Sequence, residues 1–318
     1  MITLNTSEPH EIFFPHHAKQ LGRIKKEEID FAYYTSALTA YDLIKNQELW
    51  LRNITVMNDY MEFDHGKKCL LKLIKETAEG ERLKQIFNNL KPNLFDETLL
   101  DFEKYAVNMK MDINISCFSE HKCIEEDNGK LSMWRAYGGN NGVAIIFKPE
   151  LFYWFASIGF DFSSVAYLDE IKLKKEITSL SESISNNLHY VNELSIEELK
   201  SILFNIFKFS ALCNKHIGFK EEDEWRLIAM NSIHSNHCLV SQEVETKNGT
   251  PQIISKIKLS KTLPNDPKLK DMIKKVIIGP CRHPNVIYDS ISSALVSIGV
   301  ESPDRIIYGS DIPFRVNY

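Results

Sequence analysis

The densest group of acidic side chains lies in the segment KEEDEWRL, which contains Glu222, Glu224 and Arg226. Its alternation of charged and apolar residues predicts a strand, and residues two apart on a strand share one face of the sheet. Two carboxylates that share a face with an arginine can shift one another's pKa, which is a property of catalytic sites. The same pattern is typical of an exposed edge strand whose charges are solvated. The pattern leaves both interpretations open.

A second candidate is the segment SMWRAYGGNNG, in which aromatic residues precede a cluster of glycines. Trp134 and Tyr137 are three residues apart and would share one face of a helix. Aromatic residues at this spacing belong to a core more often than to a cofactor platform. The stretch from Gly138 to Gly142 matches neither the P-loop nor the GxGxxG pattern, and it predicts a tight turn. The alternative is a loop whose backbone approaches a phosphate.

The remaining polar clusters carry weaker signals. The segment HSNHC, from His234 to Cys238, lacks a second pair of ligands at zinc spacing, so we expect no metal. Asn58 follows a predicted strand, where such a residue commonly forms a turn or caps a helix. Six scattered cysteines without a CxxC pair, and an N-terminus without a signal-peptide pattern, predict a cytoplasmic protein.

Composition limits the classes of protein that these residues can serve. The chain has 318 residues, of which 43% are hydrophobic and 25% charged, and this supports a packed core. A formal net charge of −5 argues against binding nucleic acid over the whole surface, although it is compatible with a local basic groove. The most apolar run, from Leu151 to Phe162, is too short to span a bilayer and includes an aspartate. We therefore expect no membrane partner.

Strand and helix patterns alternate along the chain in a way that would position these candidates. Helical periodicity predicts two insertions, at about residues 64–110 and 168–217. Ser195 and Glu198 have the spacing of a capping box within the second insertion. These patterns predict one α+β domain over residues 1–318, with a sheet core and two helical insertions. The predicted strands are residues 29–36, 49–56, 113–120 and 143–147, followed by DEWRLIAM, the stretch from Cys238, IISKIKL and KKVIIGP.

Seven segments together resemble a bacterial family of domains of unknown function. Members show patterns such as YHYTS, MNDxxEF, cFSE, MWRxYG, ExEWR and IPxR. The matching segments are AYYTS (Ala32–Ser36), ELWLRNITVMNDYMEF (Glu48–Phe63), CFSE (Cys117–Glu120), LSMWRAYGG (Leu131–Gly139), EDEWR (Glu222–Arg226), VIIGP (Val276–Pro280) and SDIPFR (Ser310–Arg315).

The order of these motifs looks like the ADP-ribosyltransferase fold, with a mixed or antiparallel sheet core. It is distantly similar to DarT-type nucleic-acid ADP-ribosyltransferases and to toxins of phage defence. The resemblance implies NAD as a substrate and places Glu224 in the catalytic slot, paired with Glu222 as in an ExE motif. Family members often have a histidine where this chain has Tyr33, which can still hydrogen-bond a ribose or stack on nicotinamide. The remaining implied contacts to NAD are Tyr34, Thr35, Ser36, Asn58, Ser119, Trp134, Tyr137 and Arg226.

In that chemistry positive charge develops on the ribose as nicotinamide leaves, and a neighbouring carboxylate stabilises it. The resemblance therefore implies a transferase that modifies RNA, DNA or protein, as a toxin or antiphage effector with a possible antitoxin or regulatory partner. Two alternatives stay open. The chain could be an inactive member of the fold that acts as a binding module in a defence or toxin–antitoxin complex. It could also be a metal-independent RNA-processing enzyme that uses Glu222 and Glu224.

Overall fold

A computed structural model describes residues 8–57, 62–234, 237–247, 250–261, 264 and 266–313. The α-helices are α1 (Glu8–Phe13), α2 (Pro15–Glu27), α3 (Ala37–Asn46), α4 (Glu62–Glu76), α5 (Ala78–Leu90), α6 (Leu94–Asp112), α7 (Leu131–Met133), α8 (Glu150–Ser157), α9 (Glu170–Asn186), α10 (Leu188–Val191), α11 (Ile196–Leu212), α12 (Asn231–His234), α13 (Leu269–Met272) and α14 (Pro284–Ser297). The strands are β1 (Asp30–Ser36), β2 (Glu48–Asn53), β3 (Ile113–His121), β4 (Gly142–Phe147), β5 (Asp161–Ser164), β6 (Glu224–Met230), β7 (Val240–Lys247), β8 (Thr250–Lys258), β9 (Ile273–Ile278) and β10 (Ile307–Gly309).

Most predicted elements are confirmed, because local signals define them. Ser36 ends β1 and its hydroxyl accepts a hydrogen bond from the Thr39 amide at 3.3 Å, so that it caps α3. Ser195 and Glu198 form the predicted capping box of α11. The strand predicted over residues 49–56 is too long, since β2 ends at Asn53. The side chain of Asn53 caps the 3₁₀ helix η1 (Ile54–Val56) that follows, by accepting from the Thr55 amide at 3.0 Å.

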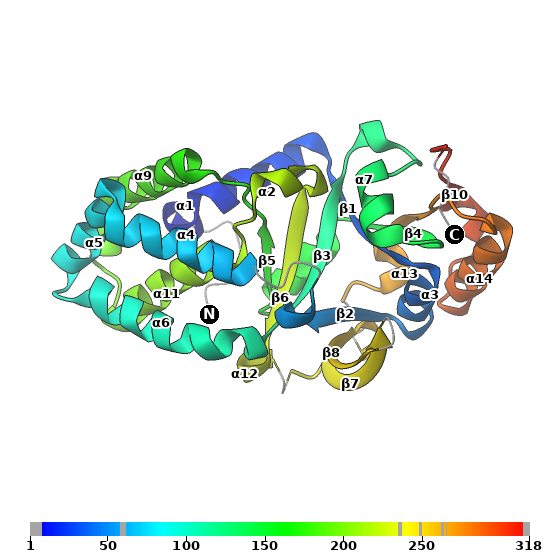
Figure 1. Cartoon of the computed structure of the whole chain (residues 1–318). Helices are drawn as coiled ribbons and strands as arrows, with labels where there is room; N and C mark the ends of the chain where they lie inside the picture. Colours follow the sequence, from blue (N-terminus) through cyan, green and yellow to red (C-terminus); the bar gives the residue numbers. More distant parts are fainter. Residues whose placement is uncertain are drawn as a thin grey trace. The chain divides into compact units, whose positions relative to one another are not determined.

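The chain divides into two compact units. The helical unit comprises Met1–Arg23, Asn53–Ile113 and Ser163–Lys220, and the sheet unit comprises Ile24–Arg52, Asn114–Phe162 and Glu221–Tyr318. The two predicted helical insertions therefore supply most of the helical unit. In that unit α11 packs between α4 and α6, and α5 packs against α9 (Figure 1). None of the helices in the described ranges is both long and apolar enough to cross a membrane.

One mixed sheet organises the sheet unit. Within the described part of the chain its strands follow the order β10-β9-β4-β1-β3-β2-β8-β7, while β6 pairs with β3 and with β5. Strand β10 is parallel to β9, whereas β1 is antiparallel to both β3 and β4. The α+β class predicted from the sequence is therefore confirmed.

Side chains on the two faces of the sheet differ in character. On one face, called the phenylalanine face, the Phe31 ring lies 4.7 Å from Phe152 and 5.4 Å from Trp225, measured between ring centroids. On the other, called the Trp134 face, Tyr34 packs edge-on against Trp134 at 4.8 Å. Because side chains alternate along a strand, each strand contributes residues to both faces. The alternation therefore decides on which of these two faces each predicted site residue lies.

Candidate functional site

Strand β1 separates the predicted tyrosines. Tyr34 lies on the Trp134 face, and its hydroxyl accepts a hydrogen bond from the Lys130 amide at 2.8 Å. Tyr33 lies on the phenylalanine face, 5.5 Å from the Phe118 ring, and by alternation Thr35 shares that face. Burial raises the pKa of Tyr33 to about 12, and the neighbouring Cys117 contributes in the same direction. The two tyrosines therefore cannot approach one ligand from the same side of the sheet.

Trp134 is part of the core of the sheet unit. It is 2% exposed and begins the π-helical turn η3 (Trp134–Gly138), and its indole nitrogen donates to the Asn128 carbonyl at 2.8 Å. Glycines surround its ring, and a Cβ added to Gly279 would lie 2.7 Å from the indole Cε3 atom. Gly142 begins β4 after the predicted tight turn, which is confirmed. The role of Trp134 as a nicotinamide contact stays a prediction.

Strand β6 is buried along its whole length, so the interpretation of an exposed edge strand is wrong. Trp225 points to the phenylalanine face, where its indole nitrogen donates to the Glu120 carboxylate at 3.0 Å. Glu224 and Arg226 therefore share the opposite face, as the sequence predicted. The Arg226 guanidinium binds both carboxylate oxygens of Glu224, at 2.8 and 3.1 Å, and the two side chains are 5% and 6% exposed.

Glu222 does not share a strand with Glu224, which corrects the sequence prediction. Glu222 ends the 3₁₀ helix η4 (Ile217–Glu222), and Asp223 between the two glutamates has φ of +43°. A left-handed residue interrupts the period of two on which the prediction rested. Half-buried Glu222 is instead reached by other predicted residues: the Tyr137 hydroxyl donates to its carboxylate at 3.2 Å, and the Ser119 hydroxyl donates to its backbone carbonyl.

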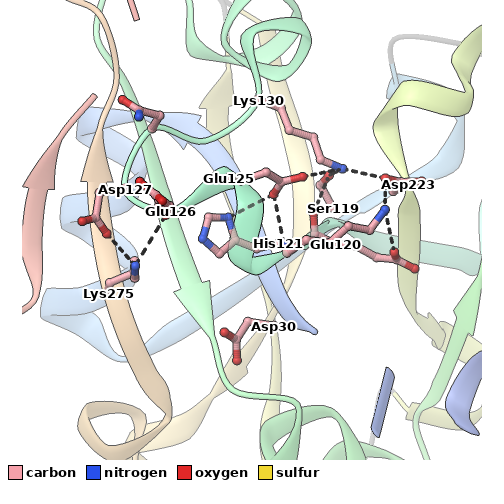
Figure 2. Close-up of polar contacts among 12 residues, drawn as sticks. Asp30, Ser119, Glu120, His121, Glu125, Glu126, Asp127, Lys130, Asp223 and Lys275 are labelled. Atoms are coloured by element: carbon pink, nitrogen blue, oxygen red, sulfur yellow. Dashed lines mark hydrogen bonds and ion pairs between the residues drawn. The ribbon is translucent and has the colours of Figure 1, made fainter. Parts of the chain in front are cut away.

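Lys130 and Asp223 stand at the centre of this arrangement, and sequence reasoning missed both. Figure 2 shows the Lys130 ammonium group between Asp223 and Glu125, with Ser119 next to it. Its Nζ atom lies 2.9 Å from the Asp223 carboxylate, 3.1 Å from the Ser119 hydroxyl and 3.6 Å from Glu125. In the sequence only their opposite charges hint at this contact, because 93 positions separate Lys130 from Asp223 and no local pattern connects them.

Electrostatics keep Asp223 ionised. Burial alone would raise the pKa of its carboxyl group, but the Lys130 and Lys122 ammonium groups outweigh that effect and hold the pKa below its usual value. Lys122 lies 2.9 Å from the same carboxylate oxygen as Lys130. Its side chain is 36% exposed, whereas that of Lys130 is 11% exposed, so Lys130 is the more enclosed of the two cations.

The structure thus brings together some of the predicted residues and leaves others apart. Ser119, Tyr137 and Glu222 are joined by hydrogen bonds. Glu224 and Arg226 form an ion pair with each other, a few residues after Glu222 in the sequence. Ser36 serves as the cap of α3, and Asn58 lies outside the described residues.

Two other features of the sheet unit bear on binding. His234, which the sequence singled out in HSNHC, is buried, and its ring contacts backbone atoms of Met230 and Gly159. Among the described residues no group of three or more His, Cys, Asp or Glu side chains is arranged to hold a metal ion. A groove of about 510 Å³ lies between α3 and α14, and none of the predicted contacts lines it: its lining residues are Ala37, Leu38, Tyr41, Val286, Ile287, Asp289, Ser290, Ile291 and Ser293.

Residues 133–227 match the model of a family described as protein of unknown function (DUF2971). The matched stretch includes Trp134, Tyr137 and the EDEWR segment, and it bears out the expectation of a domain of unknown function. Comparison with curated proteins and with solved structures returned no match.

Proposed function

We propose that the protein is an NAD-dependent ADP-ribosyltransferase that modifies a nucleic acid or a protein. The observation that carries this proposal is the convergence of Ser119, Tyr137 and Glu222, which come from three separate segments and are joined by hydrogen bonds. A serine, an aromatic residue and a carboxylate are the groups expected to contact NAD. The mixed sheet of an α+β protein is compatible with the transferase fold.

We assign the contact with the ribose to Glu222. Its carboxylate is half-buried and accepts a hydrogen bond from the Tyr137 hydroxyl, which shows that a hydroxyl donor can reach it. Glu224 is 5% exposed and both its oxygens accept hydrogen bonds from Arg226, so its charge is already paired within the protein. As the bond between ribose and nicotinamide breaks, the negative charge of Glu222 would stabilise the positive charge that develops on the ribose. Glu222 would then accept the proton of the attacking acceptor group.

The test is incubation of the purified chain with radiolabelled NAD and separate pools of RNA, DNA and protein. Wild-type protein should transfer label to one pool, and Glu222→Gln should lower the rate about 100-fold or more. Glu221→Gln is the matched control, because Glu221 is the adjacent glutamate and is exposed. If the wild-type chain neither binds NAD nor labels any pool, the proposal is wrong.

A specific observation favours a second candidate, a binding module that keeps the fold without catalysis. Tyr34 and Trp134, which would flank nicotinamide, are 7% and 2% exposed and pack on each other. In a binding module these aromatic residues would serve only the core. Partner capture that is unchanged in Glu222→Gln, with no transfer of label by the wild-type chain, would support this candidate. Cleaved rather than labelled RNA would instead indicate the RNA-processing alternative.

A further inference from the structure

The junction between Glu222 and Glu224 holds an unusual conformation. Asp223 has φ of +43°, in the left-handed region that residues other than glycine seldom adopt. Such a conformation persists only where the surrounding structure enforces it. At this junction the 3₁₀ helix η4 ends and β6 begins, so the conformation of Asp223 decides where the Glu222 side chain points relative to Glu224.

Three contacts hold Asp223 in place. The Lys130 and Lys122 ammonium groups each lie 2.9 Å from its carboxylate, and its backbone carbonyl accepts from the Glu120 amide at 3.0 Å. The side chain of Lys130 is the more enclosed of the two, and charge-assisted hydrogen bonds are stronger where water is excluded.

Lys130 also acts on the other side of the junction. Its ammonium group donates to the Ser119 hydroxyl at 3.1 Å, and that hydroxyl donates to the backbone carbonyl of Glu222. Its own backbone amide donates to the Tyr34 hydroxyl, which anchors Lys130 to β1. Figure 2 shows the ammonium group with Asp223, Glu125 and Ser119. One side chain therefore restrains the peptide between Glu222 and Asp223 from both ends.

We infer that Lys130 is a positioning residue for Glu222. It holds Asp223 in its left-handed conformation and fixes the Glu222 carbonyl through Ser119, so that the Glu222 carboxylate stays beside Tyr137. As a statement about catalysis this inference rests on the proposed function. As a statement about conformation it can be tested without any activity.

The test of the conformational role measures hydrogen exchange of the Glu120 amide, which is bonded to the Asp223 carbonyl. Lys130→Met should speed this exchange at least 10-fold, because Asp223 loses its buried partner. Adding Asp223→Gly should return the exchange to within about threefold of wild type, since glycine adopts a positive φ without strain and has no carboxylate that needs Lys130 as a partner. Lys275→Met is the matched control: Lys275 lies on β9 and pairs with Asp127, which belongs to the same loop as Lys130, so its loss should change nothing at Glu120.

Kinetics test the catalytic consequence. Lys130→Met should lower kcat for NAD at least 10-fold with KM changed less than threefold, and the double variant with Asp223→Gly should recover most of kcat. A double variant as slow as Lys130→Met would overturn the inference, because it would mean that Lys130 acts on the substrate directly.

Comparison of Asp223→Ala with Asp223→Gly is a second test, in which Lys130 is left unchanged. Both remove the carboxylate, but only alanine disfavours a positive φ, so Asp223→Ala should exchange faster at Glu120 than Asp223→Gly. Equal exchange in these two variants would refute the positioning role. If the wild-type chain proves to have no transferase activity, the exchange results still decide that role, so the two failures can be told apart.

Discussion

Removal of the Arg226 guanidinium should lower the free energy of unfolding, because it breaks the buried ion pair of the candidate site. The Nε atom of Arg226 lies 2.8 Å from Glu224 and both side chains are nearly fully enclosed. At an effective dielectric constant of about 20, Coulomb attraction at this distance is about 6 kcal/mol before the cost of desolvation. Breaking such a pair by removing one partner typically costs about 3–5 kcal/mol, and we expect this loss for Arg226→Met.

A double-mutant cycle separates the pair from its surroundings. Glu224→Gln keeps the shape of the side chain but leaves the Arg226 charge buried without its partner, so it should also cost about 3–5 kcal/mol. The double variant should be more stable than the sum of the two losses predicts, with a coupling energy of about 2 kcal/mol, because it leaves no charge buried without its partner. Arg226→Lys keeps the charge without the bidentate geometry and should fall between wild type and Arg226→Met.

Urea unfolding followed by tryptophan fluorescence measures these differences in the relevant part of the chain. All four tryptophans, Trp50, Trp134, Trp154 and Trp225, belong to the sheet unit, so their emission reports its unfolding. A loss below about 1 kcal/mol for Arg226→Met, or a coupling energy below about 0.5 kcal/mol, would refute the buried pair as the structure has it.

Two further predictions concern the same unit. Gly279→Ala should destabilise it by about 1–3 kcal/mol in the urea assay, because the new Cβ would lie 2.7 Å from the Trp134 ring. Gly309→Ala is the control, since nothing lies within 4 Å of its added Cβ, and equal stability of the two variants would contradict the packing argument. Hydrogen bonds from Lys256, and to a smaller extent from Lys258, lower the pKa of Glu243 to about 2 from an ordinary value of 4.5. The ionised Glu243 carboxylate should therefore stabilise the fold fully above pH 4.5, and this stabilisation should vanish as the pH falls toward 2. The stability difference between wild type and Glu243→Gln should shrink over that interval, and a difference independent of pH would count against the assigned cause.

Much of the fold follows from short-range patterns. The strand ending at Ser36, the capping box at Ser195 and the turn after Gly138 were all predicted from residues within a few positions of one another, and all are confirmed. The strand over residues 49–56 was predicted too long because the apolar alternation continues past Asn53, whose side chain begins a 3₁₀ helix instead. Local hydrogen bonding by an asparagine competes with strand pairing, and alternation alone does not reveal that competition.

The candidate site was predictable only in part. The pairing of Glu224 with Arg226 follows from the period of two along a strand, and it is present. The same reasoning failed for Glu222, because Asp223 interrupts the period with a conformation that residues other than glycine seldom adopt. Alternation also places Tyr33 and Tyr34 on opposite faces of β1, although the family resemblance had assigned both to one ligand.

By itself the sequence determined the class of fold, the approximate positions of most predicted strands and helices, and which residues of β6 share a face. These properties depend on periodicity and capping, which act over a few residues. Tertiary structure alone decided that Lys130 binds Asp223 and that Trp134 lies among glycines distant in the chain. Such contacts depend on strand order and register, which bring together residues that no local pattern connects. The conformation of Asp223 belongs to the same class, because charges from other segments hold it in place.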